Sequence, residues 1–371
     1  MKNIERFVKV MQYGDFDHPP LFGEGPWPET YARWHSEGLP AGMGWEQVYG
    51  VRPLGIAHHG FNEGLCPRFE ERIIEETGEF VVKIDANGCR IRDFRHHTSM
   101  PEWLDYPVKD RASFEALLGR FELKFEERFP KDFDARVRQW NAPEFDELLL
   151  PPAGAYYNVL RALAGPETIS YLFYDCPDLI HRINETMCRA CCLFAERMLP
   201  STPNVYCIGT GEDLAFKTGP LVSPAMYDEF FAPYYRRIVE VAHRHNVKLF
   251  FLDSDGNFDV LVPRMLELGI NLFNPVEVAA GMDPLALRRK YGREFRMIGG
   301  VDKRLVAAGK MAIRKEMERL FPLICEGGFI PKIDHSVSSD ISWDNFRYYM
   351  DTLLEMHLRC ANRASSAPAA L

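Results

Sequence analysis

A repeated alternation of apolar runs and amphipathic stretches is the feature that most constrains how this chain can fold. From residue 148 onward, short apolar runs recur, and segments with helical periodicity separate them. An apolar run of about four to eight residues bounded by turn formers is typical of a strand buried in a parallel sheet. So many strand–helix units in series favour an α/β fold whose sheet closes into a (β/α)8 TIM barrel. The candidate strands are 148–151, 204–209, 248–252, 271–273, 295–298 and 329–333.

The N-terminal part of the chain departs from this alternation. Residues 4–13 have helical periodicity, which predicts an N-terminal helical segment. Residues 80–91 alternate around Asn87 and Gly88, a signature of a β-hairpin, which we interpret as an insertion into the barrel. Polar helices or loops are expected over residues 101–122 and 124–140.

The domain organisation is predicted to be simple. No stretch is rich enough in Gly, Ser or Pro to divide the chain, so a single barrel domain is expected over residues 1–360. Residues 361–371 are small and polar and predict a flexible tail.

Composition excludes several classes of function. The formal net charge is −9 and no block of Lys and Arg stands out, so a nucleic-acid partner is not expected. No apolar stretch approaches the roughly 18 residues of a membrane span. The first residues lack an apolar signal core, so we expect a cytoplasmic protein whose nine cysteines are reduced. The group Cys188, Cys191 and Cys192 lacks a second Cys pair and is interpreted as buried apolar side chains.

Acidic residues and a histidine follow directly after two of the candidate strands. The run 248–252 ends in Asp253 and Asp255, and the run 329–333 ends in Asp334 and His335. In a barrel, residues just after each strand share one rim, and catalytic side chains lie there. The other rim candidates are Glu24, Glu212, Asp213, Glu277, Asp302 and Lys303.

A metal ion is one explanation of this acidic rim. Several carboxylates close together repel one another unless a cation neutralises them. Asp253 and Asp255 can both face inward if the chain turns at Gly256, and with His335 they form a ligand set that suits Zn²⁺, Fe²⁺ or Mn²⁺. The alternative is ordinary turn and helix-cap chemistry, with Asp334 accepting a hydrogen bond from a backbone amide. The pair His58-His59 has two similar interpretations, as part of the site or as an exposed loop.

At these strand ends the sequence resembles the uroporphyrinogen decarboxylase superfamily. The resemblance rests on the motifs Glu5-Arg-Phe-Val, His18-Pro19-Pro20, Gly211-Glu-Asp213-Leu, the segment 219–234, Ile298-Gly-Gly-Val-Asp302 and the segments 327–330 and 338–345. It spans nearly the whole chain and implies a (β/α)8 barrel. True decarboxylases carry an arginine-rich segment after the Pro-Pro motif to hold an acidic tetrapyrrole. Here residues 21–34 contain one Arg and two Glu, so the chain is more similar to the corrinoid-dependent methyltransferase branch.

The methyltransferase branch binds zinc through a His-x-Cys-Gly motif and a further Cys, and those positions resemble Asp253, Asp255 and His335 here. The resemblance therefore implies a divalent metal, zinc first and iron or manganese as alternatives, held by harder ligands. Such ligands suit polarising an ether oxygen, which implies O-demethylation.

The resemblance also implies a reaction and its partners. A methyl group would pass from a small methoxylated or methylated donor to a corrinoid held by a separate protein, with Glu212, Asp213 or Glu277 as proton carriers. The alternatives left open are a decarboxylase or lyase acting on a non-porphyrin carboxylic acid, and a non-catalytic barrel that binds a corrinoid. A homodimer is the default expectation for assembly.

Overall fold

The computed structural model describes residues 1–96 and 100–366 and has a mixed α/β architecture. Its main sheet is parallel, with the strand order β13-β12-β11-β10-β7. Parallel pairing continues from β7 through the bridge Pro152↔Gly209 to β6, then to β1, and through Phe22↔Leu54 to the segment around Phe22. A last parallel bridge, Pro26↔Val337, returns to the end of β13. The ring of pairings is therefore closed, and the predicted TIM barrel is confirmed.

The barrel strands are β1 (Ile56–Ala57), β6 (Leu148–Leu149), β7 (Cys207–Gly211), β10 (Leu249–Asp253), β11 (Leu272–Asn274), β12 (Arg296–Val301) and β13 (Phe329–Ile333). The remaining strands are β2 (Arg72–Glu76), β3 (Phe80–Ile84), β4 (Arg90–Phe94), β5 (Glu102–Asp105), β8 (Ala215–Phe216) and β9 (Gly219–Pro220). The helices are α1 (Asn3–Met11), α2 (Pro28–Ser36), α3 (Trp45–Tyr49), α4 (Arg111–Ala116), α5 (Phe125–Arg128), α6 (Phe133–Trp140), α7 (Tyr156–Asp175), α8 (Pro177–Met198), α9 (Pro224–Phe230), α10 (Ala232–Arg244), α11 (Val262–Leu268), α12 (Pro284–Tyr291), α13 (Lys303–Ala308), α14 (Lys310–Glu326) and α15 (Trp343–Ser366). All six apolar runs predicted as strands correspond to barrel strands.

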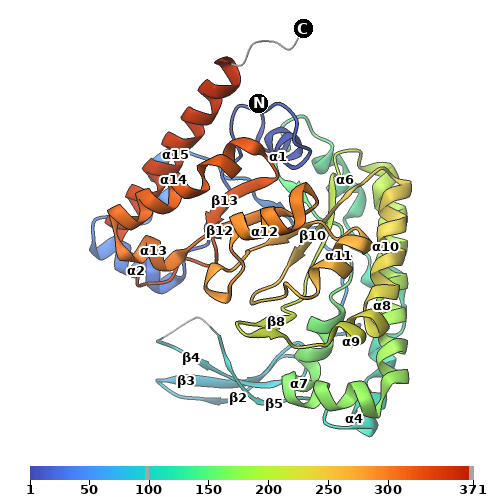
Figure 1. Cartoon of the computed structure of the whole chain (residues 1–371). Helices are drawn as coiled ribbons and strands as arrows, with labels where there is room; N and C mark the ends of the chain where they lie inside the picture. The colour runs from blue at the N-terminus through green and yellow to red at the C-terminus, as the bar shows by residue number, and fades with distance from the viewer. Residues whose placement is uncertain (97–99, 367–371) are drawn as a thin grey trace.

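The interior of the barrel is apolar and is closed at one end by α1. Side chains of alternate strand residues, such as Leu249 and Phe251 on β10, form one buried cluster with Phe7 and Met11 of α1. Because Ile4, Phe7, Val10 and Met11 recur at helical spacing, one face of α1 is apolar and packs over the amino ends of the strands. The carboxyl ends of the strands therefore form the open mouth of the barrel. Figure 1 shows α1 at the top and the β8–β9 hairpin at the opposite end.

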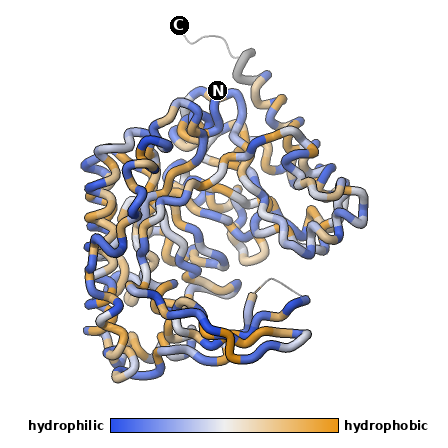
Figure 2. The backbone as a smooth tube through the Cα atoms, turned by 180° about the vertical axis from the view of Figure 1, so that it is seen from behind, coloured by the Kyte–Doolittle hydropathy of each residue, from blue (hydrophilic) through white to orange (hydrophobic). Residues whose placement is uncertain are grey.

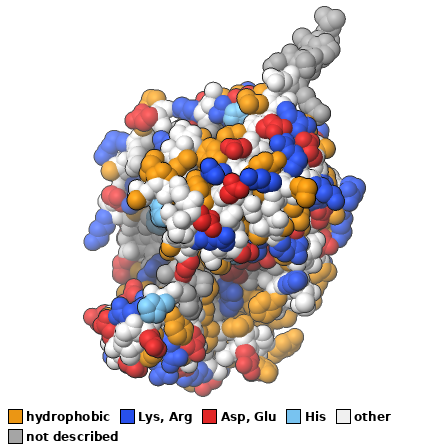
Figure 3. Space-filling view, turned by 90° about the vertical axis from the view of Figure 1, so that its left-hand side faces the viewer, with side chains coloured by type: hydrophobic (Ala, Val, Ile, Leu, Met, Phe, Trp, Pro, Cys, Tyr) orange, Lys and Arg blue, Asp and Glu red, His pale blue; other side chains and the backbone are white. Residues whose placement is uncertain are grey.

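The predicted hairpin is part of a larger sheet. Strands β3 and β4 pair antiparallel around Gly88, as the Asn-Gly signature predicts. Strands β2 and β5 extend them to four strands in the order β2-β3-β4-β5. The prediction of helix or loop for residues 102–105 was wrong, because pairing with β4 makes a strand of a segment with no clear alternation. This sheet lies below the barrel in Figure 1, and the surface between the two is hollowed in Figure 3.

Two expectations about the chain's covalent and terminal structure need correction. Helix α15 runs to Ser366, so residues 361–366 continue a helix rather than form a tail, which agrees with the helix propensity of Ala and Arg. Residues 367–371 of the predicted tail lie outside the described residues. Cys325 and Cys360 form a disulfide that joins α14 to α15, so the expectation of nine reduced thiols was wrong. The Sγ atoms of Cys188 and Cys192 lie 3.9 Å apart, in a thiol hydrogen bond and not a disulfide.

The distribution of polarity agrees with the architecture. Hydrophobic and hydrophilic residues alternate along the outer helices, as Figure 2 shows, because each helix packs one face against the barrel. In Figure 3, acidic and basic side chains are intermixed over the visible face. Within the described ranges, we find no helix that combines the length and the apolarity needed to cross a membrane.

Candidate active site at the mouth of the barrel

The turn after β10 places Asp255 at the open mouth. The backbone at Gly256 has a positive φ of 78°, and a Cβ atom there would lie 2.4 Å from the carbonyl oxygen of Ala215. Only glycine fits such a close approach of two chains. The turn that was predicted at Gly256 is present, and it leaves the side chain of Asp255 partly exposed.

Asp255 and His335 form a pair across the mouth. Nε2 of His335 lies 3.2 Å from Oδ2 of Asp255, although the two residues are eighty positions apart. This hydrogen bond raises the pKa of His335 above its usual value. Burial would raise the pKa of Asp255, but the hydrogen bond from His335 and nearby lysines lower it overall. Nδ1 of His335 is buried and has no partner among the described residues, so the proton that the ring exchanges at the mouth is the one at Nε2.

Asp253 is a separate acid next to this pair. Its Oδ1 accepts a hydrogen bond of 2.6 Å from Nδ2 of Asn274, at the end of the neighbouring strand β11. Although Asp253 is exposed at the rim, desolvation by the surrounding protein, together with the charges of Asp255 and Asp213, raises its pKa to about 6. Near neutral pH this carboxyl group therefore exchanges its proton readily.

Lys332 is a mouth residue that sequence reasoning missed. Ile330 belongs to the interior cluster, and residues two apart on a strand share a face, so Lys332 also faces the interior. Its ammonium group lowers the pKa of Glu24, Asp253 and Asp255, which places it among these carboxylates. The available signal was a single charge inside an otherwise apolar strand, in phase with an interior residue.

Glu24 is the most buried of the acids near Lys332. It is 2% exposed, and its carboxylate accepts hydrogen bonds from the hydroxyl of Tyr349 at 2.7 Å and from the amide of Ile333 at 3.0 Å. Burial raises its pKa to about 7 despite these partners and Lys332. Near neutral pH, Glu24 is therefore partly protonated, and protein donors occupy its carboxylate oxygens.

The three residues predicted to carry protons have different environments. Glu212 directly follows β7 and is fully buried against the start of α7. It accepts hydrogen bonds from the hydroxyl of Tyr235 and the amide of Asn158, and burial raises its pKa to about 7. Asp213 forms an ion pair of 2.8 Å with Arg161. Oε2 of Glu277 accepts a hydrogen bond of 3.1 Å from the amide of Gly256, beside Asp255.

The charge of Glu277 acts on His335, so Glu277 lies near the mouth pair. The charge of Asp213 acts on Asp253, so Asp213 lies near that acid. Glu212 has its oxygens occupied by protein donors. Their predicted catalytic roles remain predictions.

The predicted metal ligands are only partly brought together. Asp255 and His335 bond to each other, Asp253 bonds to Asn274, and Asp334 accepts from the amides of Val278 and Lys303. Across residues 1–96 and 100–366, no three His, Cys, Asp or Glu side chains are grouped as a metal site. In this arrangement Asp253 bonds to Asn274 and is not grouped with Asp255 and His335, and we derive no chemical step through a metal. For Asp334, the backbone interpretation is confirmed.

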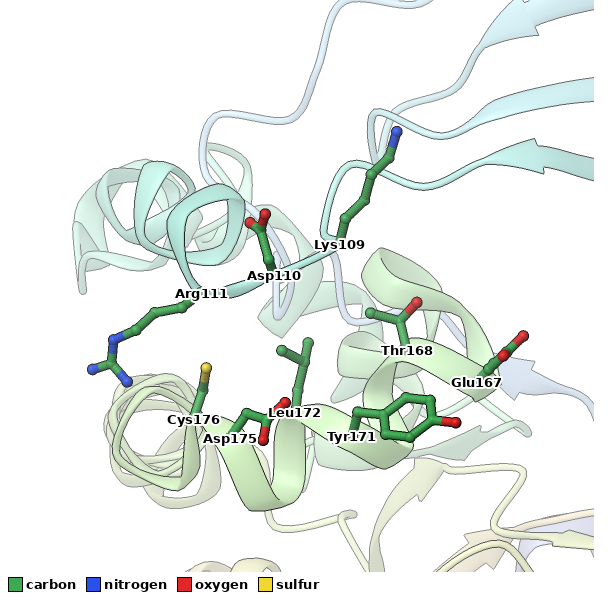
Figure 4. A pocket seen from close by; sticks show the side chains of 9 residues that line it. All are labelled: Lys109, Asp110, Arg111, Glu167, Thr168, Tyr171, Leu172, Asp175 and Cys176. Atoms are coloured by element: carbon green, nitrogen blue, oxygen red, sulfur yellow. The ribbon is translucent and has the colours of Figure 1, made fainter.

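Two pockets lie outside this set of strand-end acids. One, of about 320 Å³, lies between α7 and the residues that precede and begin α4, and Figure 4 shows its side chains, from Lys109 to Cys176. Arg111 at its edge is already paired with Asp178 at 2.6 Å. The other, of about 340 Å³, is lined by His58 and His59. These two histidines therefore line a pocket beside the mouth and are not simply an exposed loop.

These features define an α/β-barrel protein with a polar site at the carboxyl ends of its strands. Residues 153–356 match the model of the family described as uroporphyrinogen decarboxylase (URO-D), which is more than half of the 371 residues. The chain therefore belongs to the URO-D family, as its motifs implied.

Solved structures of similar fold include a methyltransferase from Methanosarcina mazei. It shares 13% sequence identity, with 96% of this chain and 99% of that chain covered at a TM-score of 0.60. A protein from Listeria monocytogenes that carries the name of a vitamin-B12 independent methionine synthase matches 60% of this chain and 69% of its own, at 10% identity and a TM-score of 0.34, and supports no argument. No curated protein matches the chain.

Proposed function

We propose that this protein is a methyltransferase that moves a methyl group from a small methoxylated or methylated compound to a corrinoid carried by a separate protein. The observation that carries the proposal is the His335–Asp255 pair at the open end of a URO-D family barrel. The fold shared over nearly the whole chain with a protein named as a methyltransferase supports it. The segment 21–34 also contains one Arg rather than the arginine cluster that an acidic tetrapyrrole would need.

The chemical need in such a reaction is a proton for the leaving oxygen. When the methyl carbon leaves a methoxy group, the electron pair of the C–O bond stays on oxygen, and the oxygen must take up a proton. A corrinoid, when bound, would supply the electron pair that forms the new bond to the methyl carbon. His335 holds a proton at Nε2 at the mouth, and Asp255 keeps that ring protonated to a higher pH. Lys332 provides positive charge near the developing oxyanion.

The test is methyl transfer from methoxylated aromatic compounds to free cob(I)alamin, followed by the formation of methylcobalamin. We expect transfer by the wild type and a loss of at least about tenfold in His335→Gln, because positioned acids contribute about 10²–10⁴ in rate. His245 is a matched control, since its Nε2 lies 3.3 Å from Glu196 in a similar pair at the end of α10. His245→Gln should leave the rate unchanged. Equal rates in His335→Gln and the wild type would remove His335 from the mechanism.

A divalent metal held by Asp253, Asp255 and His335 remains a prediction with its own test. We expect zinc in the purified protein, or added Zn²⁺, Fe²⁺ or Mn²⁺, to bind with a stoichiometry of about one that Asp253→Ala and His335→Ala reduce. If none of these metals binds the wild type, the prediction is wrong.

One observation favours a second candidate, a decarboxylase or lyase acting on a non-porphyrin carboxylic acid. Lys332 is a cation whose charge acts on the carboxyl groups of the mouth, and it could pair with the carboxylate of such a substrate. Release of CO₂ from an added acid, abolished by Lys332→Met and occurring without cobalamin, would favour this reaction. Retention of a corrinoid with neither methyl transfer nor CO₂ release would instead indicate a non-catalytic binder.

A further inference from the structure

A pocket beside the mouth has the composition of a ligand site. It lies where the chain leaves β1, between the start of α7 and the β3–β4 turn, and its volume of about 340 Å³ falls in the range of ~300–1,000 Å³ that is usual for small-molecule sites. Its polar lining comes from His58, His59, Glu63, Arg68, Asn87 and Asn158. Phe61, Leu65, Val159 and Leu163 provide apolar walls.

The two histidines that line this pocket each have Nδ1 occupied by a backbone amide. Nδ1 of His58 accepts from the amide of Gly60 at 3.0 Å, and Nδ1 of His59 accepts from the amide of Phe61 at 3.1 Å. An imidazole nitrogen that accepts a hydrogen bond is unprotonated, so the proton of each neutral ring is on Nε2. The rings are stacked 5.5 Å apart at 15°, which orders both. Burial lowers the pKa of His59 to about 4, so this ring stays a neutral donor at physiological pH.

The pocket also contains a cation without an acidic partner. The side chain of Arg68 is exposed, and in the part of the chain that the structure describes no ion pair joins it to a carboxylate. Arg161, which lies one turn after Asn158 on α7, is by contrast paired with Asp213 at 2.8 Å. Among the described residues that line the pocket, Glu63 is the one acid; it accepts from the amide of Gly154, and its Oε1 lies 3.8 Å from Nε2 of His59. Burial together with the charge of Glu212 raises the pKa of Glu63 to about 7. The positive charge of Arg68 is therefore not fully opposed near neutral pH.

We propose that this pocket binds a small carboxylic acid with an apolar body, whose carboxylate pairs with Arg68 and accepts hydrogen bonds from Nε2 of His58 and His59. A planar guanidinium binds a carboxylate in two parallel hydrogen bonds, and the apolar walls fit an aliphatic or aromatic body. The pocket adjoins the mouth, because Asn158 lines it and also donates its amide to Glu212. The proposal does not rest on methyl transfer.

The test compares benzoate with benzyl alcohol by isothermal titration calorimetry at fixed low salt. We expect saturable binding of benzoate, and binding of benzyl alcohol at least about tenfold weaker, because a hydrogen-bonded charge is lost. Arg68→Gln should weaken benzoate binding by about tenfold or more. Arg236→Gln, an exposed arginine on α10, is the matched control and should leave binding unchanged. Circular dichroism of both variants would show whether they fold.

Three outcomes would overturn the proposal. The first is the absence of saturable benzoate binding to the wild type. The second is equal affinity for benzoate and benzyl alcohol, which would show that no anion is recognised. The third is benzoate binding that Lys332→Met abolishes and Arg68→Gln does not change, which would move the acid from this pocket to the mouth.

Discussion

Replacing Glu24 by Gln should stabilise the protein at alkaline pH. Burial raises the pKa of Glu24 from its usual 4.5 to about 7, so the folded state holds this proton more tightly than the unfolded state does. Stability is therefore lost as the pH rises from about 4.5 to about 7 and stays reduced above that. Because one pKa unit corresponds to about 1.4 kcal/mol, the loss at pH 8 is about 3 kcal/mol.

Glutamine should remove this penalty and keep both contacts of the side chain. Its carbonyl oxygen can accept from the amide of Ile333, and its amide can donate to the hydroxyl of Tyr349, which can accept as well as donate. Little is lost to solvent screening, since Glu24 is 2% exposed. We therefore expect Glu24→Gln to be more stable than the wild type by about 3 kcal/mol at pH 8 and nearly equal to it at pH 4.

The assay is urea denaturation of both proteins at pH 4 and pH 8, with free energies of unfolding from linear extrapolation. Glu144→Gln, a change at an exposed glutamate, is the control and should show no such difference. If Glu24→Gln is the less stable protein at pH 8, then Lys332 compensates the buried carboxylate fully, and the reasoning from burial is refuted.

Three further predictions concern the mouth and the core. Among the described residues, neither ring nitrogen of the buried His357 has a hydrogen-bond partner, and burial lowers its pKa to about 3, so stability falls as the pH drops below 6.5. At pH 5, urea denaturation should show His357→Phe to be more stable than the wild type by about 2 kcal/mol. An unchanged difference between pH 5 and pH 8 would contradict this. Asp255→Asn removes the charged acceptor that raises the pKa of His335, so the alkaline limb of the pH profile for methyl transfer should move to lower pH. A limb that does not move would exclude His335 as the acid. Lys332→Met should destabilise the protein more at pH 8 than at pH 5, because the ammonium group stabilises the charged form of neighbouring carboxyl groups and so lowers their pKa. Urea denaturation that gives the same loss of unfolding free energy at both pH values would place Lys332 away from these carboxyl groups.

Much of the fold and part of the site could be predicted because they depend on local patterns. The six apolar runs became barrel strands, since a strand buried on both faces is apolar at every position, whichever strands lie beside it. The helix at residues 3–11 followed from its periodicity, and the turn at Gly256 followed from its glycine. For the same reason, Asp253, Asp255 and His335 could be assigned to one rim.

Other features depend on which residues meet in space, and only the tertiary structure decided them. His335 forms a hydrogen bond with Asp255, eighty positions away in the sequence. Asp253 accepts a hydrogen bond from Asn274, and the buried Glu212 accepts one from Tyr235. Lys332 lies at the mouth because its side chain is on the face of β13 that points into the barrel. The physical reason is that pairing, burial and pKa depend on distances between segments, whereas periodicity records only whether each segment has an apolar face.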